Sequence, residues 1–218
     1  HNSKMKKIKL FSIVAAFVAA FAFTSCNTGD SDGFQWPTPQ ESQALFSQIQ
    51  GMHNGGILFP GSVGTTDAEK FDKDSVTTYC YVTPSDSMLT VRQVEVSKFA
   101  KYFSDATLKA EVEKLPAQDL KIKLVPYNAA QQMFITATQD ITYTNADGKK
   151  VQIQFYSGLS NYSLAYIGTK KTNNKKELGV YITPGRVLVD GQTKANALKS
   201  YFYGGYQQAY YAMLEMEL

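Results

Sequence analysis

Residues 141–155, which read Ile-Thr-Tyr-Thr-Asn-Ala-Asp-Gly-Lys-Lys-Val-Gln-Ile-Gln-Phe, decide the fold class of this 218-residue chain. Val151, Ile153 and Phe155 alternate with polar residues, which is the period of a strand with one buried face. The turn at residues 145–148 holds the Asn, Asp and Gly residues that tight β-hairpins require. The stretch therefore predicts an antiparallel hairpin. Because the turn itself needs these residues, we expect no metal ion there.

Strand-like alternation recurs along the chain and outnumbers helical patterns. It predicts about ten short strands without a strand–helix–strand rhythm, so the fold class is mainly β, bordering on α+β. We expect a single domain over residues 38–218, built as an antiparallel β-sandwich or barrel with two or three short helices. The expected strands lie at residues 57–59, 76–82, 88–96, 120–124, 133–138, 141–144, 151–156, 162–167, 178–182, 186–189 and 210–218.

Three segments carry helix signals. Residues 38–41, Thr-Pro-Gln-Glu, form a capping box at the start of the first helix, whose apolar face runs as far as Met52. Ser104 or Asp105 caps a second helix, and the apolar spacing in residues 193–202 predicts a third.

Two strands allow finer predictions. The apolar parity changes between Val91 and Val94, which predicts a β-bulge near Arg92 and Gln93. Cys80 alternates with aromatic residues along its strand, a pattern typical of a small buried hydrophobe rather than a reactive thiol.

The first 25 residues have the three-part layout of a secretory signal peptide. Lys6, Lys7 and Lys9 precede the apolar run at residues 10–23, and small residues follow it. This run is shorter than the roughly 20 residues that cross a bilayer as a helix. We therefore expect residues 1–25 to be removed.

Residues 23–26, Phe-Thr-Ser-Cys, resemble a lipobox, in which the cysteine is acylated and becomes the new N-terminus. The resemblance implies that the protein meets the membrane through acyl chains on Cys26. Asn27 follows the cysteine where Asp would signal retention in the inner membrane, so the resemblance implies an outer-membrane lipoprotein. Asp30 and Asp32 resemble a surface-export signal, but whether the domain faces the periplasm or the cell surface stays open.

Cleavage changes the charge balance. Residues 1–25 contain four lysines and no acid, so the mature chain has 18 basic and 19 acidic residues and a net charge of −1. This balance gives no electrostatic reason to expect a nucleic-acid partner. Cys26 and the polar residues up to 37 form a lipidated, flexible tether that precedes the domain.

The densest candidate site is a group of five tyrosines near the C-terminus, beside a Gly-Gly pair that predicts a turn. If the tyrosines are exposed, their rings can stack on sugars and their hydroxyls can make polar contacts. The same composition also fits a half-buried strand, which is the alternative. The five are Tyr201, Tyr203, Tyr206, Tyr210 and Tyr211.

Evidence for an enzyme is weaker. No Gly-x-Ser-x-Gly motif accompanies His53, which we interpret as a residue at a helix C-terminus, and no motif predicts a cofactor. The basic run at residues 170–176 fits a solvated hairpin tip. Paired carboxylates of a glycosidase come from distant strands and leave no local spacing. Candidate acids, none of which forms a preferred pair, are Glu41, Glu69, Asp72, Asp74 and Glu95.

Several segments of the chain carry a family resemblance. They are the lipobox, the Asp-Ser-Met-Leu-Thr-Val-Arg stretch at residues 86–92, residues 96–99 and the tyrosine-rich end at 210–218. They look like those of a Bacteroidota lipoprotein family of unknown function. The resemblance implies an envelope lipoprotein with a β-rich domain and transfers no catalytic residue. Two hypotheses follow. The favoured one is a non-enzymatic binding or accessory module for a glycan or an envelope protein, and the alternative is a glycoside-type hydrolase with two carboxylates.

Overall fold

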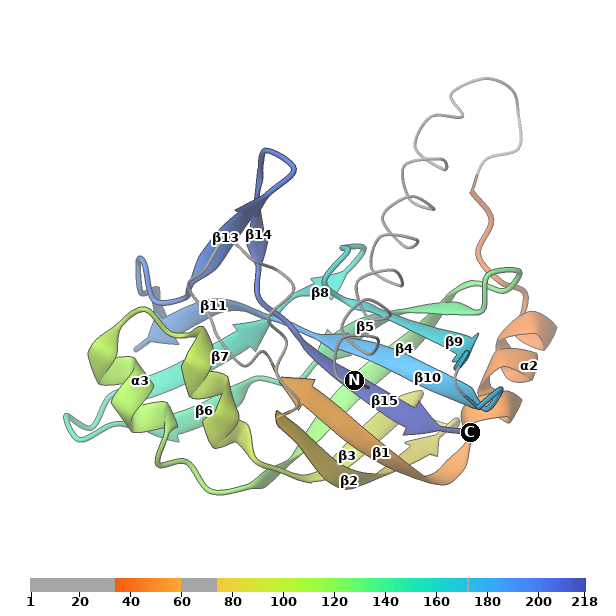
Figure 1. Cartoon of the computed structure of the whole chain (residues 1–218), viewed down its shortest axis with the longest axis horizontal. Helices are drawn as coiled ribbons and strands as arrows, with labels where there is room; N and C mark the ends of the chain where they lie inside the picture. Colours follow the sequence, from red (N-terminus) through yellow and green to blue (C-terminus); the bar gives the residue numbers. More distant parts are fainter. Residues whose placement is uncertain (1–33, 60–73, 172) are drawn as a thin grey trace.

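The computed structural model describes residues 34–59, 74–171 and 173–218 (Figure 1). The predicted signal peptide, Cys26 and the predicted tether up to residue 33 lie outside the described residues, as do Glu69 and Asp72. No helix in the described part is long and apolar enough to cross a bilayer.

Eight strands form a closed antiparallel barrel. This confirms the prediction of a mainly β fold, and of the two predicted architectures, sandwich and barrel, the structure has the barrel. In order around the ring the strands are β4 (Gln118–Asn128), β3 (Met88–Val94), β2 (Asp74–Thr83), β1 (Gly51–Phe59), β15 (Ala212–Glu217), β10 (Lys176–Ile182), β9 (Leu164–Thr169) and β5 (Met133–Thr138). Pairing of β5 with β4 closes the ring. The last strand, β15, lies between β1 and β10, which confirms that the C-terminal segment is part of a sheet.

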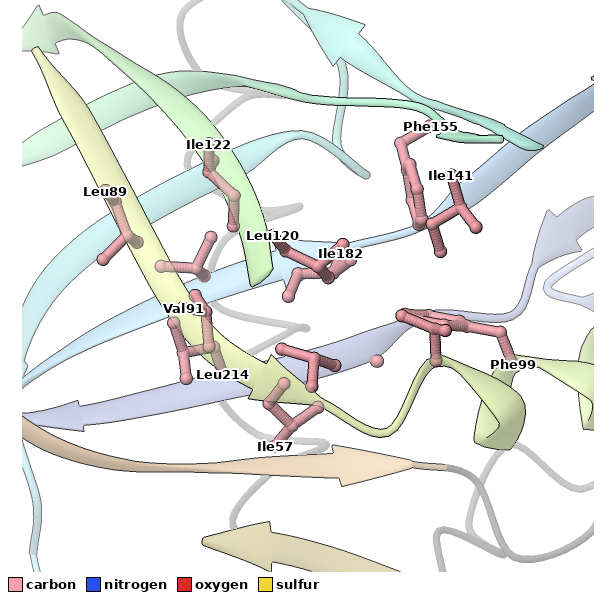
Figure 2. Packing of buried hydrophobic residues seen from close by; sticks show 14 of the residues in the cluster. Ile57, Leu89, Val91, Phe99, Leu120, Ile122, Ile141, Phe155, Ile182 and Leu214 are labelled. Atoms are coloured by element: carbon pink, nitrogen blue, oxygen red, sulfur yellow. The ribbon is translucent and has the colours of Figure 1, made fainter. Parts of the chain in front are cut away.

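Apolar side chains fill the barrel interior. Leu89 and Val91 on β3, Leu120 and Ile122 on β4, and Leu214 on β15 are all buried and belong to one cluster (Figure 2). An eight-stranded barrel has an interior just wide enough for side chains to fill. The interior is therefore the hydrophobic core of the domain, and the outer surface carries the residues that can meet a ligand.

The helix α2 (Pro39–Ile49) lies at one end of the barrel (Figure 1). Its predicted capping box is present, since the backbone N–H of Thr38 donates to Glu41 at 2.8 Å and that of Glu41 donates to the Thr38 hydroxyl at 3.2 Å. The ring of Phe46 contacts that of Phe134 on β5, with centroids 5.5 Å apart. This contact joins the helix to the barrel core.

The first helix ends earlier than predicted. Gly51 has a φ of +90° and begins β1, so Met52 lies exposed on a strand rather than on the helical face. A left-handed φ of this kind stops a helix and suits glycine. His53 likewise lies on β1 and not at the end of the helix, but its side chain reaches back to the helix C-terminus, where its Nε2 lies 3.0 Å from the carbonyl oxygens of Ile49 and Gln50.

A second sheet continues the core beyond the other end of the barrel. It has the order β12 (Gln192–Thr193), β11 (Pro184–Val189), β7 (Lys150–Phe155), β6 (Ile141–Thr144), and β6 with β7 is the hairpin predicted at residues 141–155. The 3-10 helix η1 (Val96–Tyr102) and the helix α3 (Ala106–Val112) pack beside this sheet (Figure 1). The ring centroid of Phe99 on η1 lies 5.5 Å from that of Phe155 on β7 (Figure 2). It also lies 5.2 Å from that of Phe59 on β1, so one ring links the barrel and the second sheet.

The helix predicted at residues 193–202 is wrong. Asn196 has a φ of +54°, and the segment is held by long-range backbone bonds from Ser104 to Ala197 at 2.9 Å and from Lys199 to Tyr102 at 2.7 Å. These tertiary bonds outweigh a weak local preference. The short strands β8 (Ser157–Gly158), β13 (Ser200–Tyr203) and β14 (Tyr206–Ala209), together with β12, raise the strand number above the predicted ten.

The two finer strand predictions are confirmed. The register of β3 against β4 shifts between Val91 and Val94, and Gln93 has a φ of +49°. The bulge therefore lies where the alternation of apolar residues along the strand changes phase. Cys80 is fully buried, and burial raises the pKa of its thiol to about 12. A thiol with so high a pKa stays protonated at neutral pH and is a poor nucleophile.

Candidate functional site

The hairpin β13–β14 carries three of the five predicted tyrosines, Tyr201, Tyr203 and Tyr206, and projects from the body of the domain (Figure 1). Its strands pair Tyr203 with Tyr206 across the turn at Gly204 and Gly205. Both glycines have positive φ, +59° and +82°, as a two-residue turn that matches the twist of a hairpin requires. The Gly-Gly pair therefore fixes the register that positions the neighbouring aromatic residues.

The five predicted tyrosines do not share one surface. Tyr206 is 73% exposed, whereas Tyr201 is half-buried against Tyr210, with ring centroids 4.7 Å apart. Tyr210 is buried in the main core, and Tyr211 is buried in a second cluster on the outer face of the barrel. The side chain of Tyr203 lies outside the described part. Consecutive residues of an extended chain point to opposite faces, which separates Tyr210 from Tyr211.

Other aromatic residues join Tyr206 near this hairpin. Phe202 on β13 is 65% exposed. The Tyr162 hydroxyl donates to the Gln208 side chain and accepts the backbone N–H of Ala209 at 3.2 Å, which ties the base of the hairpin to the barrel. Tyr156 packs on Tyr162, with centroids 4.9 Å apart. The register pairs Phe202 with Gln207 and Tyr203 with Tyr206, so Phe202 and Gln207 point to one face of the hairpin and Tyr206 to the other. We use the name hairpin surface for both of these faces together with Tyr156 and Tyr162 at the base of the hairpin.

The hairpin surface combines the exposed rings of Phe202 and Tyr206 with polar side chains. The Gln207 amide N–H donates to the Ser200 hydroxyl at 2.6 Å, and the Gln207 side chain is exposed. Burial, and to a lesser degree Tyr156, raises the pKa of Tyr162 even though the Ala209 N–H lowers it. Its phenol is therefore neutral and remains a hydrogen-bond donor. Exposed aromatic rings with polar groups nearby are the groups that can stack on a sugar ring or contact a peptide.

Sequence reasoning missed Phe202, Tyr156 and Tyr162. Tyr156 carries a readable signal, because it continues the polar parity of Gln152 and Gln154 on the side of the strand away from the core. No local signal identifies Tyr162, since its role depends on a hydrogen bond to a residue 46 positions later.

The outer-face cluster covers part of β5, β9, β10 and β15. Its buried members are Met133, Leu164, Tyr166, Tyr181, Tyr211 and Met213. Tyr166 lies directly opposite Gly179 in the pairing of β9 with β10, and its ring occupies the space that a side chain at Gly179 would need. The glycine thus allows an aromatic ring to lie flat on the barrel wall.

Two carboxylates beside this cluster share one lysine. The Lys170 ammonium lies 3.0 Å from a Glu215 oxygen and 3.7 Å from a Glu177 oxygen. Burial and then the Glu215 charge raise the pKa of Glu177, against the lowering effect of Lys170. Burial lowers the pKa of Lys170, but Glu215 and Glu177 outweigh it and the pKa is raised overall. Lys170 is therefore an exception in the basic run, which otherwise forms the exposed tip between β9 and β10 as predicted.

Glu177→Gln is expected to raise the melting temperature at pH 7. A carboxyl group whose pKa is raised by folding adds stability while protonated, and that contribution is lost as pH rises through the folded-state pKa. Glutamine removes the buried charge, so the gain should shrink to nothing as pH falls below that pKa. Thermal unfolding from pH 3 to 8 measures it. Glu215→Gln is the matched control: it loses the 3.0 Å ionic hydrogen bond and should not stabilise. A lower melting temperature of Glu177→Gln at pH 7 would show that the Lys170 pair outweighs burial.

Of the five acids considered for a glycosidase, Glu41 and Glu95 have side chains in the described part of the chain, and each has a local partner. Glu41 caps α2, and Glu95 begins η1 and pairs with Lys98 at 3.9 Å. Asp74 begins β2, and its side chain, like Glu69 and Asp72, lies outside the described part.

Comparison with known proteins yields one family. The family model described as a domain of unknown function, DUF4840, matches residues 48–189, which run from the end of α2 to the end of β11. No curated protein and no solved structure matches the chain. The matched segment includes seven of the eight barrel strands and the second sheet apart from β12, while the closing strand β15 follows it. Because the match covers more than half of its length, the chain belongs to the DUF4840 family.

Proposed function

We propose that this protein is an outer-membrane lipoprotein, anchored through acyl chains on Cys26, whose barrel domain is a non-enzymatic binding or accessory module for a glycan or a partner protein. The observation that carries the binding role is the projecting hairpin, where Phe202 on one face and Tyr206 on the other are 65% and 73% exposed. Exposing rings of this size to water is unfavourable, and large exposed rings are typical of contact surfaces.

A glycoside hydrolase has less support. Its two carboxylates need open space between them for the sugar and, in inverting enzymes, for a water molecule. Glu177 and Glu215 are the described acids that share a neighbour, yet the Lys170 ammonium binds both and Glu177 is only 8% exposed. This arrangement fits an ion-paired group on the barrel wall that leaves no room for a sugar between its carboxylates.

The binding role is tested with the lipoprotein purified from membranes, by a glycan array and by pull-down from envelope extract. Phe202→Ala and Tyr206→Ala are each expected to weaken capture by about tenfold or more, since a central aromatic contact contributes roughly 2 kcal/mol. Both side chains are exposed, so the melting temperature should stay unchanged. Tyr79→Ala, at another exposed tyrosine on β2, is the matched control. Capture that neither hairpin variant weakens, or an array and pull-down that both return nothing, would count against the proposal.

A further inference from the structure

A second group of aromatic side chains lies at the α2 end of the domain, just before that helix. Phe34 stacks on Tyr127, near the end of β4, with centroids 4.7 Å apart and planes at 22°. Trp36 stands edge-on to both rings, 5.2 Å from Phe34 and 5.9 Å from Tyr127. We call these three residues the aromatic triad. Figure 1 shows the segment that starts at residue 34 leading into α2 beside the β4–β5 connection.

Two of the three rings lie outside the folded core, whereas Tyr127 packs against the outer-face cluster. Phe34 is 54% exposed and Trp36 is 58% exposed, and neither belongs to a buried cluster. Each square ångström of apolar surface left in water forgoes about 25 cal/mol. Two large rings held by a third at the surface, with much of their area in water, therefore indicate a partner that covers them.

The geometry favours a lipid surface over a sugar. A sugar stacks on open ring faces, but the facing sides of Phe34 and Tyr127 cover one another, and Trp36 lies at 83° and 80° to them. The three rings thus form a compact wedge rather than a flat platform. Tryptophan and tyrosine favour the boundary between hydrocarbon and water, because each has an apolar ring with a polar group.

The distance along the chain points to the same partner. Phe34 follows Cys26 by eight residues. An extended chain reaches at most about 3.6 Å per residue, so an acylated Cys26 holds the triad within about 29 Å of the lipid that contains its acyl chains. The mature chain has a net charge of −1, so attraction to anionic lipid does not contribute.

We propose that Phe34, Trp36 and Tyr127 dock on the headgroup region of the bilayer that holds the acylated Cys26. The α2 end of the barrel then faces the membrane. The β13–β14 hairpin, which Figure 1 shows well separated from α2, is free to meet ligands away from the lipid. This inference rests on the proposed lipid anchor and adds a second contact that orients the domain.

Trp36 is the single tryptophan of the chain, so its fluorescence reports on the triad without any label. The lipoprotein purified from membranes is reconstituted into phosphatidylcholine vesicles that contain phospholipids brominated near either the headgroup or the acyl-chain end. Docking predicts a shift of the emission to shorter wavelength and loss of most of the signal with shallow bromines, with less loss from deep ones. Phe34→Ser and Tyr127→Ser should each reduce the quenching, Tyr79→Ala should not, and added salt should change nothing.

Flotation of the same vesicles separates the two proposals. If the protein floats with the vesicles but Trp36 stays quenched by aqueous iodide and unaffected by brominated lipid, the docking inference is overturned while the anchor stands. A protein that does not float contradicts the anchor and the docking together. A Trp36 signal that responds to soluble glycans and not to brominated lipid would identify the triad as a sugar site and also overturn the inference.

Discussion

Gly179→Ala should destabilise the domain by about 1–3 kcal/mol, the range observed when a methyl group is forced into a packed site. A Cβ at Gly179 would lie 2.7 Å from Cζ and 2.9 Å from Cε1 of the Tyr166 ring, and 2.9 Å from Cε of Met213. The flexible end of Met213 can move, but the ring of Tyr166 is held in the outer-face cluster. Chemical denaturation of the two proteins measures the difference.

Two further variants separate this steric effect from a general effect of alanine. Gly56→Ala lies on β1 of the same barrel, and a Cβ there meets only the Val76 carbonyl oxygen, at an ordinary 3.6 Å. It should be neutral or slightly stabilising, because alanine restricts the unfolded chain more than glycine does. In a Tyr166→Ala background the ring is gone, so Gly179→Ala should cost far less. An equal loss in both backgrounds would rule out the ring contact as the cause.

Local periodicity predicted individual strands well. The alternation in residues 151–155, the parity change at the β3 bulge and the capping box of α2 are each set by residues within a few positions of one another, and all are present. Closure of the barrel is a different kind of property. It depends on β15 pairing with β1, which lies more than 150 residues earlier in the chain, and no spacing within either strand specifies that partner.

In the candidate site, too, the features set by neighbouring residues were predictable and those set by long-range contacts were not. Composition identified the tyrosine-rich region but not its faces, so Tyr210 and Tyr211 were grouped with Tyr206 although both are buried. The residues that complete the hairpin surface, Tyr156 and Tyr162, come from a different part of the chain. Glu177 and Glu215 meet at Lys170 only because β10 and β15 are paired. Contacts of this kind are a product of the folded topology.

Cys26→Ala should move nearly all of the domain from the membrane fraction to the soluble fraction. Several acyl chains on one cysteine bind a bilayer stably, since each buried CH₂ contributes about 0.8 kcal/mol, and a single aromatic triad does not replace them. Cys80→Ala is the matched control. It removes the other cysteine of the chain, which is buried in the barrel core, and should leave membrane retention unchanged. Full membrane retention of Cys26→Ala would contradict an anchor at this residue.

The most direct test of the lipid anchor is the mass of the N-terminal peptide of the protein isolated from membranes. With the anchor in place, we expect a peptide that begins at Cys26, lacks residues 1–25 and carries the added mass of its acyl chains. A mature protein that begins elsewhere, or an unmodified Cys26, would contradict the lipoprotein account.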